Sequence, residues 1–281
     1  MSGNSVISAV DVFALPLWLL VLLVLILIPS AALLGYRTGR HTHGLQQDLP
    51  LDKKAQPSDT SIGAFLALLG LLLAFTYSFA LSRFDDRKDG LLLEANALGT
   101  AFVQAMLLEE PKRTDYRETI LAYAETRSFG TAMNRDGTPL GDLLNVSLER
   151  QAALTDTLET VLASDVEAAI RNSMTGSLTD ILDAHTIRVE AQADSIPQAL
   201  KYLLAMVAAF AVFMVGHDAG IRGKPLTWRV LAFSGLLIIV LVQIFDFERP
   251  ASGIIRVPET IMLITIEDMR SELAVEQSSL Q

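Results

Sequence analysis

IGAFLALLGLLLAFTYSFAL, residues 62–81, is a run of 20 residues that contains no charged side chain. A helix of that length reaches across the hydrocarbon of a bilayer, which takes roughly 20 apolar residues. No proline interrupts the chain from Ile62 to Leu108, so nothing in this stretch ends the helix at the membrane surface. We therefore predict one helix of about 45 residues that leaves the bilayer and enters a soluble domain.

Three other apolar segments complete the predicted membrane part. The four expected spans cover residues 15–35, 62–82, 199–216 and 229–247. They predict an all-α, polytopic membrane protein with four transmembrane helices in two hairpins. The expected domains are an N-terminal hairpin in residues 1–82, an acidic helical soluble domain in 83–198, a C-terminal hairpin in 199–247 and a tail in 248–281.

Two of the spans have an alternative interpretation. The alternative for the first span is a cleaved signal peptide. The span is too long for the apolar core of such a peptide, and no lysine or arginine precedes it. The third is short enough for a buried soluble helix, but its pairing with the fourth favours a membrane hairpin. On the second span, Gly63, Ala67 and Gly70 have spacings that suit close helix packing.

Charge is concentrated in the middle of the chain. Between Phe84 and Pro197 there are 20 acidic residues against 10 basic ones, and the rest of the chain carries 12 of each. An acidic domain argues against nucleic acid as a partner, because binding phosphates needs a basic surface. There is no cysteine, which excludes disulfides and thiolate metal sites. His41 and His43 lie in a polar linker and are interpreted as solvated residues rather than metal ligands.

Catalytic and nucleotide-binding motifs are absent from the sequence: there is no P-loop, no dinucleotide fingerprint, no nucleophile elbow and no HExxH. We therefore expect no enzyme activity, no cofactor and no metal site. In the soluble domain, apolar residues recur at spacings of four and three. The members of this stripe are Val166, Ile170, Met174, Leu178, Ile181, His185 and Val189. His185 is accordingly interpreted as a core or interface residue of a long amphipathic helix.

Polar residues continue along the helix that begins at Ile62. At about 100° per residue, one set lies on a single face. This set consists of Ser78, Ser82, Asp85, Asp89, Asn96 and Thr100. Arg83, Arg87 and Glu94 form a second cluster roughly opposite Asp85. Either one face lines a path between symmetric subunits, where acidic rings favour cations and basic rings anions, or both faces only solvate the helix.

The run AFTYSFALSRFDDRKDGLLLEANALGTAF, residues 74–102, resembles the bacterial bestrophin-like membrane family, whose function is not established. The pattern comprises Ser82-Arg83-Phe84, Arg87, Glu94-Ala95-Asn96-Ala97 and Gly99-Thr100. DFERPASGIIRV, residues 246–257, resembles the segment that follows the last helix in that family. Elsewhere the similarity is one of topology.

The resemblance implies a homo-oligomeric, channel-like protein, because true bestrophins are pentameric anion channels whose second membrane helix lines the pore. The pore or gating candidates are then Leu71, Ala74, Phe75, Ser78, Ser82, Asp85 and Asp89. The motif or intersubunit ion-pair candidates are Arg83, Arg87, Glu94, Asn96, Arg249 and Arg256. The implied partners are further copies of this chain, the lipid bilayer and small ions. The acidic residues of the stripe depart from the analogy, since they do not suit anions.

Orientation follows from basic residues near the spans. Arg37, Arg40, Lys53 and Lys54 follow the first span and none precedes it, which predicts an extracytoplasmic N-terminus and soluble domain in a cell (inner) membrane. Counted over all short flanks, the two sides are equal, and the soluble part of true bestrophins is cytoplasmic. The alternative function is a membrane-anchored sensing or interaction module without transport activity.

Overall fold

The computed structural model describes residues 13, 15–46, 50, 59–128, 140–163, 165–249 and 253–279, with side chains between 140 and 163 from residue 145 onward. Helices dominate these residues, and no strand occurs among them. The helices are α1 (Leu17–Leu45), α2 (Asp59–Gln104), η3 (Ala105–Leu107), α3 (Lys112–Thr126), α5 (Leu140–Leu162), α6 (Ala168–Ala193), α7 (Gln198–Ile221), α8 (Trp228–Phe247) and α9 (Thr260–Ser279). The all-α prediction is confirmed, and so is the unbroken second helix.

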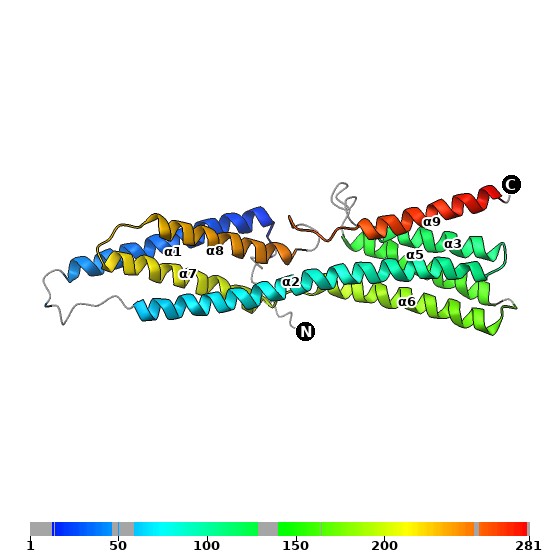
Figure 1. Ribbon diagram of the computed structural model, residues 1–281, viewed down its shortest axis with the longest axis horizontal. Helices are drawn as coiled ribbons and strands as arrows, with labels where there is room; N and C mark the ends of the chain where they lie inside the picture. Colours follow the sequence, from blue (N-terminus) through cyan, green and yellow to red (C-terminus); the bar gives the residue numbers. More distant parts are fainter. Residues whose placement is uncertain are drawn as a thin grey trace, which may run out of the picture. The chain divides into compact units, whose positions relative to one another are not determined.

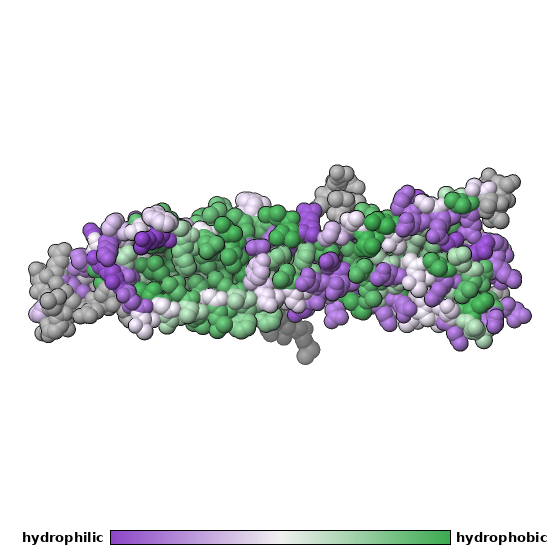
Figure 2. All heavy atoms as spheres, viewed as in Figure 1, coloured by the Kyte–Doolittle hydropathy of each residue, from purple (hydrophilic) through white to green (hydrophobic). Residues whose placement is uncertain are grey.

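One compact unit, which we call the membrane unit, comprises Met1–Arg83 and Ser195–Ile255. Its helices α1, α7 and α8 lie side by side with the first part of α2 (Figure 1). Four helices of the described chain are long and apolar enough to cross a membrane, as the sequence predicts. Their outer surface is predominantly hydrophobic (Figure 2). This exposure of large apolar side chains fits a lipid environment.

Helix α1 packs mainly along α7, which belongs to the other predicted hairpin. Glycines allow this contact: a Cβ on Gly35 would lie 2.0 Å from the Phe213 carbonyl oxygen, and one on Gly216 2.2 Å from that of Ala32. In contrast, a Cβ added to Gly63 or Gly70 would meet no neighbouring helix of the described chain within 4 Å. The close packing expected around Gly63 on the second span thus occurs within the chain between α1 and α7 instead.

The second compact unit, the soluble unit, comprises Phe84–Asp194 and Arg256–Gln281. The end of α2 packs here with α3, α5, α6 and α9 around one apolar core, and hydrophilic side chains cover much of the visible surface (Figure 2). The C-terminal helix α9 belongs to this core, whereas the sequence suggested a separate tail from residue 248. Its buried residues are Met262, Ile266, Met269 and Leu273. Their spacing of four, three and four is the pattern of an amphipathic helix that needs a partner.

Candidate pore-facing helix and the clusters that hold it

Helix α2 has one buried stripe and one outward face. In the membrane unit, Leu69, Thr76 and Ala80 are buried, while Leu71 and Phe75 are 55% and 57% exposed. Ala74, Ser78 and Ser82 are also exposed. At about 100° per residue, Leu71, Phe75, Ser78 and Ser82 cluster opposite the buried stripe. No other part of the described membrane unit therefore covers this face of α2.

The same division continues where α2 belongs to the soluble unit. Asp85, Asp89, Asn96 and Thr100 are exposed, whereas Leu91, Glu94 and Leu98 on the other side of the helix are buried. The two predicted stripes thus have different environments. The stripe of Ser78 and Asp85 is open, and the Arg87–Glu94 side belongs to the core.

Glu94 is the centre of a buried ion cluster, which we call the Glu94 cluster; its other members are Tyr123, Arg127, His185 and Arg188. Arg127 Nε donates to Glu94 Oε1 at 2.6 Å, and Arg188 Nη1 donates to Oε2 at 2.6 Å. Burial acts to raise the pKa of the Glu94 carboxyl, but the charges and hydrogen bonds of the two arginines outweigh it and lower this pKa. Each Glu94 contact described here is made within the chain.

Tyr123 and His185 extend the Glu94 cluster towards the surface. The Tyr123 hydroxyl lies 3.2 Å from Glu94 Oε1 and 3.0 Å from His185 Nδ1. Burial, followed by the nearby Glu94 charge, raises the pKa of Tyr123, so the phenol stays protonated. Burial and the charge of Arg127 lower the pKa of His185, against an opposing effect of Glu94. The core position predicted for His185 is confirmed, at 8% exposure.

Arg87, the second buried member of the motif, holds the end of another helix. Its Nε donates to the Ala191 carbonyl at 3.2 Å and its Nη2 to the Asp194 carbonyl at 3.0 Å. These carbonyls lie at the C-terminus of α6, where a positive charge is favourable. Arg83 is half-buried and Asn96 is exposed. Arg87 therefore fastens α2 to α6 within the soluble unit and does not lie on the outward face.

The second motif stretch organises one end of the membrane unit. Asp246 accepts hydrogen bonds from the backbone nitrogens of Ile254 and Ile255 at 2.7 and 2.8 Å. Arg249 Nη2 donates to the carbonyls of Phe13 and Leu15. These contacts close the turn after α8 and fasten the segment that precedes α1. Arg256 is exposed and lies in the soluble unit.

Glu248, in the same stretch, joins α8 to the start of α7. Its Oε2 accepts from Lys201 Nζ and from the Ile196 backbone nitrogen, each at 2.8 Å. Lys201 is buried, and its ammonium group pairs with Glu248. The pairing is a tertiary contact over many residues, which no local pattern indicates.

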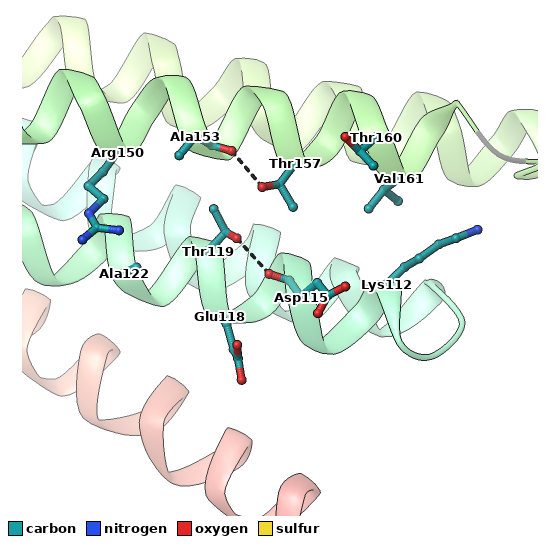
Figure 3. A pocket seen from close by; sticks show the side chains of 10 residues that line it. All are labelled: Lys112, Asp115, Glu118, Thr119, Ala122, Arg150, Ala153, Thr157, Thr160 and Val161. Atoms are coloured by element: carbon teal, nitrogen blue, oxygen red, sulfur yellow. Dashed lines mark hydrogen bonds between the residues drawn. The ribbon is translucent and has the colours of Figure 1, made fainter.

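An open groove lies between α3 and α5 in the soluble unit (Figure 3). Lys112, Asp115 and Arg150 line it together with threonines. Thr119 donates to the Asp115 carbonyl and Thr157 to the Ala153 carbonyl, each at 2.8 Å, so these hydroxyls are used by their own helices. The protons of these two hydroxyls are therefore not available to a ligand.

Sequence reasoning missed the partners of Glu94, namely Tyr123, Arg127 and Arg188. Only Arg188 gave a local signal: it lies seven residues after Ile181 and three after His185, on the stripe that predicts burial. Tyr123 and Arg127 lie on α3 and at its C-terminal end, a segment without a clear apolar stripe.

The fold and these clusters define a multi-pass, α-helical membrane protein with a helical soluble unit. The sequence matches the Bestrophin-like domain over residues 24–262, and the chain belongs to this family. The resemblance in residues 74–102 and 246–257 is thereby confirmed.

Solved structures of a bacterial bestrophin homologue from Klebsiella pneumoniae have a similar fold. Two of its variants match with TM-scores of 0.65 and 0.64 at 12% and 13% identity, and each match covers 89% of this chain and 98% of the other. A structure described as a membrane protein matches with a TM-score of 0.63 at 14% identity, covering 88% of this chain and 98% of the other. A comparison with curated proteins finds no match.

Proposed function

We propose that this protein forms a homo-oligomeric, channel-like pore in which the outward face of α2 lines the path. The observation that carries the proposal is the exposure of that face from Leu71 to Thr100, opposite the buried and half-buried side of the same helix. Leu71, Ala74 and Phe75 would form an apolar constriction, and Ser78, Ser82, Asp85 and Asp89 a polar path. Membership of the Bestrophin-like family supports a homo-oligomer, and a pentamer is the arrangement suggested by analogy with true bestrophins.

Charge on this face favours cations as the permeant species. Asp85 and Asp89 are exposed, and no basic residue lies within about 60° of Asp89 on the helix between Leu71 and Val103. The fold makes the surface of the soluble unit more negative, because four of its arginines are buried. Glu94 is its one buried acidic residue among those described. The buried arginines are Arg87, Arg117, Arg127 and Arg188. The solvent around the soluble unit therefore faces a more negative surface than the composition suggests, which concentrates cations.

Orientation and location are part of the same proposal. The basic residues after the first span support an N-terminus and a soluble unit outside the cytoplasm, in a cell (inner) membrane. A fluorescent protein that matures only in the cytoplasm, inserted in the loop between α1 and α2, tests this arrangement. Fluorescence is expected from that insertion and none from a fusion at the C-terminus, and the opposite pattern reverses the orientation.

Purified protein reconstituted in liposomes tests the pore. We expect a potassium flux that exceeds chloride flux, and the double variant Asp85→Asn, Asp89→Asn should reduce this preference. Asp156→Asn is the matched control, because Asp156 is an exposed aspartate on α5. An Arg87→Gln variant would not test the ion preference, because Arg87 is buried and holds the end of α6. Monomeric particles without flux, or equal ion preference in all three proteins, would overturn the proposal and favour a sensing or interaction module.

A further inference from the structure

We infer that Glu94 is a positioning residue that fixes the outward face of α2, and that His185 loosens this hold when it takes up a proton. The inference rests on the proposed function, because it concerns regulation of the same face. It comes from a buried cluster that the permeation path itself does not use.

Glu94 lies on α2 nearly opposite Asp85 and Asp89, so its contacts decide which side of the helix points outward. The carboxylate receives one guanidinium from each side: Arg127 follows α3, and Arg188 belongs to α6. Arg127 Nη1 lies 3.3 Å from Ser147 Oγ on α5, and Arg188 Nη1 also donates to the Arg127 carbonyl at 3.0 Å. Through these contacts one carboxylate connects α2 to three other helices of the soluble unit.

Tyr123 connects His185 to this carboxylate by a short relay. The phenol has one proton, and when it donates to Glu94 Oε1 its oxygen is free to accept from His185 Nδ1–H. His185 Nε2 then lacks a proton and is the atom that takes one up. Because His185 retains 8% exposure, it lies at the solvent side of the Glu94 cluster, whereas Glu94 is fully buried.

Charged side chains surround His185 from several elements of the soluble unit. Glu94 faces it from α2, Tyr123 from α3, Arg127 from the residue after α3, and Arg188 from α6. Glu259, before α9, lies 3.5 Å from Arg188. Protonated His185 adds a third positive charge 3.8 Å from Glu94 Oε1. The imidazolium then competes with Arg127 for this oxygen and weakens the tie between α3 and α2.

Proton uptake by His185 occurs below the ordinary histidine pKa of about 6.5, because burial and Arg127 lower its pKa. We expect α2 to lose its fixed rotation in this range and the flux to fall.

The test compares full-length wild-type protein with His185→Gln between about pH 7.5 and about pH 5.5, a range in which histidine changes charge. Flux and the thermal unfolding temperature are both measured. Acidification should lower wild-type flux by roughly two-fold or more, and the flux of His185→Gln should stay nearly constant. The wild-type unfolding temperature should fall by about 3 °C more than that of the variant. His41→Gln, at an exposed histidine of α1, should behave as wild type.

Tyr123→Phe provides a second variant if His185→Gln does not fold. It keeps the ring and removes the hydroxyl that lies between His185 and Glu94, so the pH at which its flux falls should differ from that of wild type. Identical pH profiles of wild type and both variants would overturn the inference, even with a robust flux that upholds the proposed pore. Absence of flux at every pH would instead remove the proposed pore, and a persisting difference in unfolding temperature would still support the release of Glu94 by His185.

Discussion

The two compact units hold their helices together in opposite ways. In the membrane unit, α1 and α7 meet backbone to backbone at Gly35, Gly39, Gly216 and Gly220, with no room for side chains. In the soluble unit, α2, α3 and α6 meet through long charged side chains around Glu94. In lipid there is no hydrophobic driving force for apolar helices to associate, so their association depends on close van der Waals packing. Water drives burial of an apolar core, which can also enclose a paired carboxylate.

The contrast also explains which motif residues face outward. In the soluble part of α2, Arg87 and Glu94 are buried, one charge of each sign, while the outward face carries the exposed Asp85 and Asp89 and is negative. A short sequence motif therefore mixes residues that build the bundle, Arg87 and Glu94, with residues that are free to act, Asp85 and Asp89. Variants that separate these roles make the comparison testable.

The largest effect is expected from Glu94→Gln. The substitution leaves two buried arginines without the carboxylate that neutralises them, which should cost about 3–5 kcal/mol of unfolding free energy. Thermal or denaturant unfolding in detergent, followed by circular dichroism, measures this loss. Glu159→Gln, at an exposed position of α5, should change stability by less than about 0.5 kcal/mol. Equal stability of the two variants would show that the Glu94 cluster does not support the soluble unit.

A smaller loss is expected from Gly216→Ala in the membrane unit. The new methyl group would lie 2.2 Å from the Ala32 carbonyl oxygen, so α1 and α7 must separate, at about 1–3 kcal/mol. Gly235→Ala on α8 is the control, because nothing lies within 4 Å of its added carbon. Thermal aggregation of the detergent-solubilised protein compares the two. A Gly216→Ala protein as stable as Gly235→Ala would contradict the close contact.

The pH dependence of stability tests the Glu94 cluster of the soluble unit. Since the pKa of Glu94 is lowered in the folded protein, its contribution is complete above the ordinary glutamate value of about 4.3. The contribution is lost as the pH falls through the lower, folded-state pKa. Unfolding temperatures of wild type should therefore fall more steeply below about pH 4.3 than those of Glu94→Gln. Parallel curves would mean that Glu94 titrates alike in the folded and unfolded protein.

The smallest effect is expected at an exposed ion pair of the soluble unit. Arg270 bridges Glu125 and Glu267 at 2.7 and 2.8 Å, but its side chain is 54% exposed. Arg270→Ala should cost about 0–1 kcal/mol, because solvent and salt screen such pairs. The same unfolding measurement used for Glu94 checks this value, and a loss near that of Glu94→Gln would remove the distinction between buried and exposed pairs.

The local sequence was sufficient to predict the membrane spans, the long second helix and the buried position of His185. Each depends on the polarity of neighbouring residues, which a run such as residues 62–81 displays directly. The exposed stripe of Ser78, Asp85 and Asp89 was also visible from helical spacing, but its environment was not. Spacing places residues on a face of a helix and leaves open what that face meets.

Only the tertiary structure decided the partners. It paired α1 with α7, brought α9 into the soluble core and placed Arg127 and Arg188 against Glu94, 33 and 94 residues away along the chain. Hydropathy is a sum over adjacent residues, so it does not predict which distant guanidinium will neutralise a carboxylate. That choice depends on how the helices pack in three dimensions, where a buried charge is tolerated only beside its counter-charge.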